Sequence, residues 1–515
     1  MKKTLKKISN VCKWIFGYGI LITLFVGGLT AIGYVVALCI GGETAAIICD
    51  VIYKKIVPVL TYVTTSLVLF GLLSMYLAGE KALTVGGKKI KREKAEGEIR
   101  ILKLPAYHDP EQTASSHLAH DLEDAYVAEG ISMDIYCPTP TRGITADVRK
   151  KYKKIKHEEL RDGKVSVHRF SMFREKRNPI QRALRYVLVN QKQYNKACQA
   201  DGIDVVMSGS TPPTQGILCA RVRKKLSKRY GKRVPMILAL QDIFPDSLVT
   251  AKMTTKGSII WKIGRKIEDY TYNNADKIIV ISEDFKKNIM AKGVPEDKII
   301  IIPNWVDSEK VYPINRENNV LFERYGLDKD KFYITYSGNI GHSQNMRMLL
   351  DAAKDLRDTL PELRFVLIGE GAARDEVQKA IKDEGVDTVT LLPFQPYEDI
   401  AHVFSLGDAG LIISKSGTGN NSVPSKTWSI MAAERPVLAS FDEDSALARL
   451  IDEVGCGVNA KADDVDELKA AIIKLYENRE ENAKIGALGR AYLKEYLDKD
   501  KCVGMYVETI KNSLK

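Results

Sequence analysis

The chain has 515 residues and a mass of 57.5 kDa, which is too long for one hydrophobic core and predicts about two to four domains. Its 45% hydrophobic content excludes a disordered chain, and its eight cysteines, scattered without Cys-x-x-Cys spacing, favour reduced thiols in the cytoplasm over a disulfide framework or a zinc ribbon. The net charge of +12 does not indicate nucleic acid, because no basic strip is interleaved with stacking aromatics and much of the basic excess flanks apolar segments near the N-terminus.

Two apolar segments near the N-terminus are expected to cross a membrane. Residues 14–40 and 56–78 carry no charged side chain. Each is long enough to span about 30 Å of hydrocarbon at about 1.5 Å per residue. A cleaved signal peptide is the alternative for the first segment, but its apolar part exceeds the usual length of about 7 to 15 residues, and a second segment follows at once. We therefore expect a membrane hairpin over residues 1–80.

Basic side chains flank this hairpin on both outer sides, which predicts that both of its ends lie in the cytoplasm. The connection between the segments contains Glu43 and Asp50, but also Lys54 and Lys55. A hairpin that inserts without crossing the bilayer completely predicts the same location for the rest of the chain. We therefore expect the remaining domains at the cytoplasmic face of the cell membrane. The flanking residues are Lys2, Lys3, Lys6, Lys7 and Lys13 before the hairpin, and Lys81, Lys88, Lys89, Lys91, Arg92 and Lys94 after it.

From residue 99 onward, short β-branched runs alternate with amphipathic helical stretches, the pattern of parallel sheets covered by helices. A polar connector at about 311–330 separates two sets of runs, which predicts two Rossmann-like doubly wound α/β domains, 98–310 and 328–495, that meet across a cleft. A C-terminal helix is expected at 496–515. The first set of strands is 99–104, 131–137, 165–170, 204–208, 236–240, 277–281 and 299–302, and the second is 332–336, 364–368, 388–392, 409–413 and 436–440.

Three segments of the second domain have the composition of a phosphate cradle. Residues 337–341 and 368–371 place glycines directly after buried strands, and residues 422–426 open a helix that ends near 433–437. Backbone N–H groups at such junctions, and a helix N-terminus, can face an anion. A glycine after a strand is often a plain turn, but three such segments in one half of the chain together predict a nucleotide diphosphate site.

Lys426 is the strongest single candidate for a charged contact with that phosphate. Ser422 or Ser425 is expected to cap the helix, and Pro424 suits its first turn. A lysine near a helix start is electrostatically unfavourable unless an anion compensates it. The alternative is a solvated lysine on the helix surface.

The first domain offers candidates at two loops. The loop 105–116 follows the first expected strand, so His108 or Glu111 could reach a donor or an acceptor, and an amphipathic helix is expected from about 116 to 129. Asp242 and Asp246 flank another strand end that faces the same cleft. A carboxylate there could orient or deprotonate an acceptor hydroxyl, and capping a helix is the alternative.

These residues resemble the GT-B glycosyltransferases, specifically the retaining family 4 branch that includes bacterial N-acetylfucosamine transferases of surface-polysaccharide assembly. The resemblance covers about 99–515 and implies a nucleotide-sugar donor held by the second domain and an acceptor held mainly by the first. It is strongest in Tyr336-Ser-Gly-Asn-Ile-Gly, Phe365-Val-Leu-Ile-Gly-Glu-Gly, Leu392-Pro-Phe-Gln-Pro-Tyr-Glu-Asp, Ser422-Val-Pro-Ser-Lys and Met431-Ala-Ala-Glu-Arg-Pro-Val, and it extends to Gln241-Asp-Ile-Phe-Pro-Asp-Ser, Val280-Ile-Ser-Glu and Ile302-Pro-Asn-Trp-Val-Asp.

The residues expected at the reacting centre are Lys426, Asp242 and His108. Those expected to bind the donor are Ser337, Gly338, Asn339, Gly341, Gly369, Gly371, Phe394, Gln395, Asn421, Ser422, Ser425 and Lys426.

The chain departs from the wider family at several positions. Asn421 and Ser429 stand where the family has a pair of glutamates, and Asn339 and Asn345 stand where many relatives have Arg and Lys. The positive role therefore shifts to Lys426 and Lys415. Glu434, where the family has glycine, has no explanation in the sequence.

A metal site is not expected. His117 and His120 lie at helical spacing without a third ligand in register. The acidic run 442–444 matches an Asp-x-Asp pattern that binds Mn²⁺ in another transferase fold, but here it stands at a helix entry, where acidic residues favour the helix dipole. We therefore expect a metal-independent enzyme without a cofactor.

The leading hypothesis is a membrane-anchored retaining glycosyltransferase that moves a sugar from a UDP-sugar to a polyprenyl-diphosphate-linked or other cell-surface glycan acceptor. The branch resembled implies that the sugar is N-acetylated. One alternative is a UDP-sugar epimerase, although no Gly-x-Gly-x-x-Gly opens either domain. Another is a non-catalytic nucleotide-sugar-binding membrane scaffold, which the missing glutamates suggest.

Overall fold

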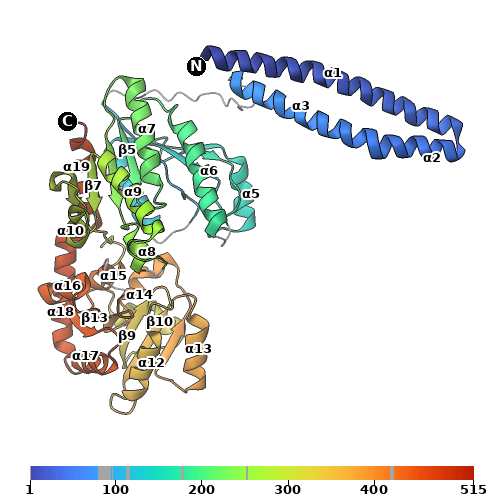
Figure 1. Ribbon diagram of the computed structural model, residues 1–515. Helices are drawn as coiled ribbons and strands as arrows, with labels where there is room; N and C mark the ends of the chain where they lie inside the picture. The colour runs from blue at the N-terminus through green and yellow to red at the C-terminus, as the bar shows by residue number, and fades with distance from the viewer. Residues whose placement is uncertain are drawn as a thin grey trace. The chain divides into compact units, whose positions relative to one another are not determined.

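The computed structural model describes residues 2–78, 94, 97–111, 116–175, 179–250, 253–417 and 423–515. The chain divides into two compact units, Met1–Glu93 and Lys94–Lys515 (Figure 1). The first unit is a pair of long helical arms. The second contains two α/β domains, each with one sheet. This division confirms the expected class, two parallel-sheet domains preceded by two apolar helices.

The first unit is a helical hairpin whose second arm is longer than expected. Helix α1, Lys2–Ile40, is followed by α2, Gly42–Val51, a π-helical turn, Ile52–Ile56, and α3, Val57–Ala78. The chain turns at Gly41 and Gly42, whose φ angles of 68° and 65° favour glycine. The expectation of a connection reaching to residue 55 is therefore wrong, because Asp50 and Lys54 lie on the helical arm as an i,i+4 ion pair.

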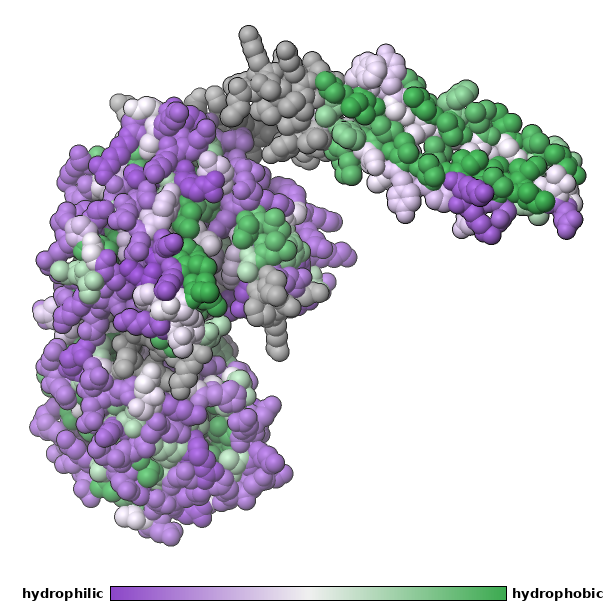
Figure 2. All heavy atoms as spheres, viewed as in Figure 1, coloured by the Kyte–Doolittle hydropathy of each residue, from purple (hydrophilic) through white to green (hydrophobic). Residues whose placement is uncertain are grey.

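Both arms are long and apolar enough to be candidate membrane spans, Val11–Ile40 and Gly42–Leu72. Their outward surfaces are largely hydrophobic (Figure 2). The arms pack closely where one of them has a glycine. A β-carbon at Gly19 would lie 2.3 Å from Leu67, and one at Gly71 would lie 2.8 Å from Phe16. Such small residues let helix backbones approach one another inside a bilayer.

The second unit begins with an eight-stranded sheet in the order β3-β4-β2-β1-β5-β6-β7-β8. All neighbours are parallel except β3, which pairs antiparallel with β4 at the edge and was not expected from the sequence. The strands are β1 Ile99–Lys103, β2 Ile131–Pro138, β3 His157–Leu160, β4 Val165–Phe170, β5 Val205–Gly209, β6 Met236–Leu240, β7 Lys277–Val280 and β8 Ile299–Ile301. The covering helices are α4 Ser116–Ala128, α5 Ala146–Lys154, α6 Pro179–Ala197, α7 Gln215–Tyr230, α8 Asp246–Thr250, α9 Ile259–Asn274 and α10 Glu283–Ala291.

A six-stranded, fully parallel sheet follows in the order β11-β10-β9-β12-β13-β14. The edge strand β14 was not expected. The strands are β9 Phe332–Ser337, β10 Leu363–Ile368, β11 Val389–Leu392, β12 Ala409–Ile413, β13 Val437–Phe441 and β14 Gly457–Lys461. The helices are α11 Val320–Tyr325, α12 Met346–Asp355, α13 Arg374–Asp383, α14 Ile400–Phe404, α15 Lys426–Ala432, α16 Ala446–Val454, α17 Val465–Glu477 and α18 Arg479–Tyr496.

The last helix, α19 Lys499–Asn512, returns to the first sheet and completes its core. Cys502, Tyr506 and Ile510 are buried in the same cluster as Trp305 and residues of β1 and β2. The indole of Trp305 donates to Asp121 on α4 at 2.8 Å. The chain therefore passes between the two sheets twice, and the final crossing fastens the two layers together.

Glu434 terminates α15 in a left-handed conformation. Its φ is 56°, and the N–H of Arg435 donates back to the carbonyl of Ile430 at 3.2 Å. This is the position after a helix where glycine is favoured, because a β-carbon there is strained. This backbone would suit a glycine, and nothing in the structure explains why Glu434 stands here.

Candidate donor site

Both sheets change strand order next to a central strand, and ligands of doubly wound folds bind at such switch points. In the second sheet the change lies between β9 and β12. The loop after β9 begins at Gly338, and the segment after β12 leads to Lys426 at the start of α15. The topology therefore brings the first glycine segment and Lys426 to one end of the sheet, as the sequence predicted.

The loops after β9 and β10 touch through their backbones, and glycine makes that contact possible. A β-carbon at Gly369 would lie 1.9 Å from the carbonyl oxygen of Gly338. One at Gly371 would lie 2.2 Å from the carbonyl oxygen of Ile340. Any side chain at Gly369 or Gly371 would separate these loops. The two glycines therefore act in loop packing, and their expected contact with the donor stays a prediction.

The backbone donors of the first loop differ from the expected cradle. The N–H of Ile340 donates to the carbonyl of Glu370 at 2.9 Å, and that of Gly341 donates to the side-chain oxygen of Gln344 at 3.1 Å. Two of the three N–H groups at 339–341, in the first segment of the expected phosphate cradle, are therefore occupied by loop packing. Within the described residues, Asn339 alone of the three has an N–H without a hydrogen bond.

Lys426 reaches from α15 back to the loop after β9. Its Nζ lies 3.9 Å from the ring centroid of Tyr336, and it would be 3.0 Å from a β-carbon at Gly338. The residue as a whole is partly exposed, but burial of its ammonium group lowers the pKa of Lys426 to about 8. Among the described residues no carboxylate forms an ion pair with it. The site thus presents a cation that lacks a protein counter-ion.

Tyr336 was not singled out by the sequence, and it completes this arrangement. Its ring face meets the ammonium group of Lys426, a contact of cation–π type. Its hydroxyl donates to the carbonyl of Asn339 at 2.6 Å, which fixes the loop over the ring. The signal in the sequence was the aromatic residue directly before the Ser-Gly-Asn motif.

The expected cap of α15 is not formed by Ser425. Ser425 occupies the N-cap position of this seven-residue helix, but its exposed side chain makes no capping hydrogen bond, and its φ and ψ of −58° and −25° are already helical. Helical backbone at the N-cap turns the side chain away from the N–H groups that it would cap. Asn421 and Ser422 lie outside the described residues. Lys426 is therefore the charged group that this helix contributes.

Phe394 and Gln395 follow β11 and differ sharply in exposure. The side chain of Phe394 is 69% exposed, whereas Gln395 is buried. The Gln395 amide donates to the carbonyl of Pro393 and to the hydroxyl of Tyr325, both at 2.7 Å. Gln395 therefore supports the loop from beneath, and its expected contact with the donor stays a prediction. Ser337 ends β9 with intermediate burial, next to Gly338.

His108 and Glu111 in the first domain are structural in this arrangement. His108 Nε2 lies 3.4 Å from the buried carboxylate of Glu123, and the carboxylate of Glu111 accepts the N–H groups of Thr141 and Arg142 at 2.6 and 2.8 Å. Burial raises the pKa of Glu111. Both groups pack at the carboxyl edge of the first sheet, where the side chain of His108 is largely buried, and the predicted contact of His108 with the reacting centre stays a prediction.

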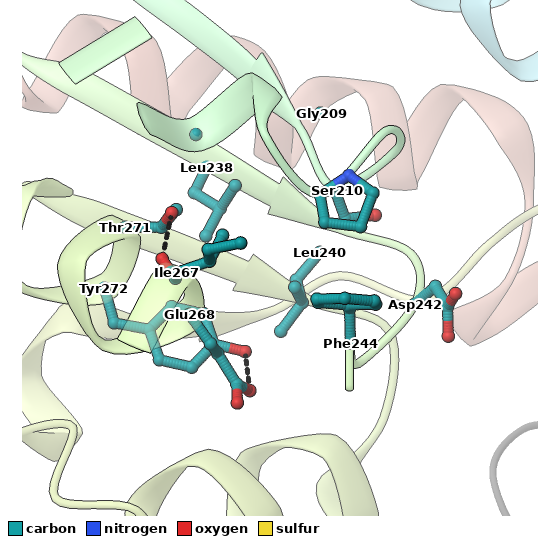
Figure 3. Close-up of a pocket in the computed structure, with 12 residues that line it drawn as sticks. Gly209, Ser210, Leu238, Leu240, Asp242, Phe244, Ile267, Glu268, Thr271 and Tyr272 are labelled. Carbon is teal, nitrogen blue, oxygen red and sulfur yellow. Dashed lines mark hydrogen bonds between the residues drawn. The ribbon is translucent and has the colours of Figure 1, made fainter. Parts of the chain in front are cut away.

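Asp242 keeps an accessible position at a pocket of about 30 Å³ formed at the ends of β5 and β6. Figure 3 shows Asp242 at the rim, beyond Phe244, while Glu268 and Tyr272 lie deeper and are joined by a 2.6 Å hydrogen bond. Partial burial raises the pKa of Asp242, which favours a role as a proton acceptor. Burial would also raise the pKa of Asp246, but its hydrogen bond and ion pair with Lys292 at 2.7 Å outweigh this and lower it.

The residues considered for metal binding have other partners. His120 pairs with Asp109 at 2.7 Å in a second pocket, of about 280 Å³, that His117, Lys310 and Tyr397 also line. Asp442 accepts hydrogen bonds from the backbone N–H of Gly417 and the hydroxyl of Ser416, both at 3.0 Å. Across the part of the chain that is described, no group of three or more His, Cys, Asp or Glu side chains could hold a metal ion.

Two family models match the chain after the hairpin. Residues 116–310 match "Glycosyltransferase Family 4", and residues 317–492 match "Glycosyl transferases group 1". WbjE of Pseudomonas aeruginosa, named as a probable glycosyltransferase, is 27% identical over 292 residues, which are 57% of this chain and 70% of WbjE. WcaI of Escherichia coli K12, named for colanic acid biosynthesis, is 25% identical over 299 residues, or 57% of this chain and 72% of WcaI.

Among solved structures, HepE of Anabaena in complex with UDP and glucose aligns with a TM-score of 0.58 at 15% identity. The alignment covers 80% of this chain and all of HepE. The second unit therefore has the GT-B fold. Together with both family matches, this fold, which is of the nucleotide-sugar type, indicates that the chain is a glycosyltransferase. The matches favour sugar transfer over the epimerase alternative.

Proposed function

We propose that this chain is a membrane-anchored, retaining glycosyltransferase that transfers an N-acetylated sugar from a UDP-sugar to a polyprenyl-diphosphate-linked acceptor of cell-surface glycan assembly. The observation that carries the donor half of this proposal is Lys426, a buried cation without a counter-ion among the described residues. A nucleotide diphosphate would supply the missing negative charge at the switch point of the second sheet.

Lys426 would act mainly on the leaving group. As the bond from the sugar to the diphosphate breaks, negative charge develops on the phosphate oxygens, and a fixed cation there lowers the barrier. A single positioned donor of this kind is typically worth about 3 to 4 kcal/mol in the transition state. The free N–H of Asn339 lies in the same loop that Lys426 approaches and could donate to the same phosphate.

Asp242 would act on the acceptor. It stands at the carboxyl end of β6 in the first sheet, and the raised pKa of its carboxylate suits it to accept a hydrogen bond or a proton from an acceptor hydroxyl. The cavity beside it is lined by Leu238, Leu240 and Phe244, and also by polar side chains such as Glu268 and Tyr272.

The lipid acceptor is supported by the N-terminal hairpin. Its arms, Val11–Ile40 and Gly42–Leu72, have the length and composition of membrane spans. Anchoring would keep the enzyme at the cytoplasmic face of the cell membrane, where a polyprenyl-linked acceptor is also confined. The relative named for colanic acid biosynthesis supports a role in surface-glycan assembly.

The test is transfer from a panel of UDP-sugars to a short polyprenyl-diphosphate sugar by the purified full chain. We expect transfer from a UDP-N-acetylhexosamine or a related N-acetylated donor, with the anomeric configuration retained in the product. Activity should persist in excess EDTA, because helix dipole and lysine replace a metal in neutralising the diphosphate. Loss of activity in EDTA with rescue by Mn²⁺ would contradict the metal-independent part, and absence of transfer from every donor would favour the scaffold alternative.

A further inference from the structure

The first α/β domain has two helices, α6 and α9, that expose large apolar side chains while they bury polar ones. On α6, the exposed face carries Leu184 and Val187, which are 54% and 60% exposed, together with Leu188. The opposite face buries two polar side chains, Arg185 and Gln193, alongside the apolar Val189 and Ala197. A surface helix of a water-soluble domain normally has the reverse arrangement. The apolar face of α6 is therefore not explained by the packing of the domain.

The buried polar face of α6 has a clear structural role. Arg185 donates to the carbonyl of Phe173 at 3.3 Å and to the hydroxyl of Thr141 at 3.2 Å. The Gln193 amide donates to the carbonyls of Leu104 and Tyr136 at 2.9 and 2.8 Å. These hydrogen bonds satisfy backbone carbonyls beneath the helix. They do not involve Leu184, Val187 and Leu188, which remain exposed on the outer face.

Helix α9 repeats the arrangement of α6. Ile259, Ile260 and Ile263 are 78%, 58% and 55% exposed. The inner face instead buries Glu268, which accepts a hydrogen bond from the hydroxyl of Tyr272 at 2.6 Å and pairs with Lys292 at 2.9 Å. Figure 2 shows hydrophobic atoms gathered over α6 and over α9 on one face of the unit, within a hydrophilic surround.

The apolar stretch of α9 occupies its first turns, and that of α6 lies in its second and third turns. Both helices follow the carboxyl edge of the first sheet. Helix α6 follows β4 and α9 follows β6, so each begins at the edge that carries Asp242 and the acceptor pocket. We call Leu184, Val187 and Leu188 of α6, with Ile259, Ile260 and Ile263 of α9, the apolar rim. The rim lies on the domain that would receive the acceptor.

The charges beside the rim favour an anionic partner. Lys256 precedes α9, and Lys262 and Lys266 lie exposed among its isoleucines. None of these three lysines forms an ion pair with a carboxylate of the described residues. Exposed aliphatic side chains with unpaired lysines beside them form the composition that binds a bilayer interface with anionic headgroups.

We infer that the apolar rim is a second membrane-docking surface, which seats the catalytic domain on an anionic bilayer with the acceptor pocket at the headgroup level. Docking in this way presupposes the membrane anchoring proposed above and adds an orientation to it. The hairpin would confine the enzyme to the membrane, while the rim would turn Asp242 toward an acceptor diphosphate at the bilayer surface.

The experiment uses the full chain in vesicles, with the photoreactive residue p-benzoylphenylalanine introduced at Val187 or Ile260. The control position is Lys228, which is exposed near the C-terminal end of α7 and therefore at the opposite edge of the sheet. Vesicles contain phosphatidylcholine alone or with about one third phosphatidylglycerol, and lipid adducts are measured by mass spectrometry. We expect adducts at Val187 and Ile260 at least about fivefold above the control, and a severalfold decrease without the anionic lipid.

A matched pair of variants separates docking from anchoring. Ile260→Glu with Ile263→Glu changes the charge by the same amount as Lys228→Glu, but only the first should lower the adduct yield at Val187, by about tenfold. Both variants should still float with vesicles through the hairpin and still hydrolyse donor in detergent. Adduct yields at both rim positions equal to the control, or cross-links between two copies of the chain in place of lipid adducts, would overturn the inference. If the unmodified chain itself does not float with vesicles or does not hydrolyse donor, the result would instead contradict the proposed function.

Discussion

At the scale of single residues, the account depends on Lys426 and on how its environment alters it. The ammonium group contacts the Tyr336 ring and approaches Gly338, and its burial lowers its pKa to about 8. A lysine is costly to charge when its ammonium group is buried and no carboxylate of the described residues forms an ion pair with it. An anionic ligand would remove that cost, so the position of Lys426 is consistent with binding of a diphosphate.

The lowered pKa predicts a pH dependence for donor use. Lys426 is cationic below pH 8 and neutral above it, so kcat/KM for the donor should be level below pH 8 and fall about tenfold for each pH unit above it. A pH–rate profile of the full chain in detergent measures this directly. In Lys426→Arg, which stays charged to above pH 12, any remaining activity should not show the decrease. A profile level to pH 9.5 in the unmodified chain would contradict the assignment.

The second prediction at this scale concerns stability, and it is that replacing Glu434 by glycine stabilises the protein. The left-handed φ of 56° at Glu434 costs an L-residue about 1 to 2 kcal/mol, while glycine gives back about 0.5 to 1 kcal/mol in chain entropy. Glu434→Gly should therefore increase the unfolding free energy of the second unit by up to about 1.5 kcal/mol, which a small rise of its thermal midpoint would report. Glu434→Ala keeps the β-carbon and should bring no gain. A glycine variant less stable than the alanine variant would show that the Glu434 side chain has its own role.

At the scale of elements, the regular parallel strands could be predicted from the sequence because each is a short buried apolar run. The edge strands β3, with the sequence His-Glu-Glu-Leu, and β14, with Gly-Val-Asn-Ala-Lys, escaped prediction because they are polar and each pairs on one side only. The predicted second arm of the hairpin was too short. The charged residues at 50–55 suggested a loop, but in the structure they continue the helix.

The candidate site was predictable in position but not in detail. Glycines after strands and a lysine at a helix start must meet where strands of one sheet end, so Gly338 and Lys426 could be placed together. The direction of individual groups could not be read from the sequence. The N–H of Ile340 and the amide of Gln395 are both taken up by packing between neighbouring loops. Such contacts depend on the three-dimensional approach of segments that are distant along the chain.

At the scale of the whole molecule, the hairpin and the α/β unit are separate compact bodies. Removing residues 1 to about 80 should therefore leave the GT-B unit folded and able to hydrolyse donor. Transfer to a long-chain lipid acceptor in vesicles should fall by about tenfold or more, because anchoring raises the effective concentration of enzyme at the acceptor. The truncated chain should still bind anionic vesicles to some extent through the apolar rim. Equal rates for the truncated and the full chain would assign the hairpin to another purpose, such as partner assembly.

The central claim is that Lys426 is the cation for the leaving diphosphate. The most direct measurement compares the full chain with Lys426→Ala for UDP binding by titration calorimetry and for single-turnover transfer, with circular dichroism to show that both are folded. The account predicts that transfer falls by about tenfold or more and falls further than UDP affinity, because charge on the diphosphate grows in the transition state. Unchanged transfer kinetics in a folded Lys426→Ala variant would contradict it.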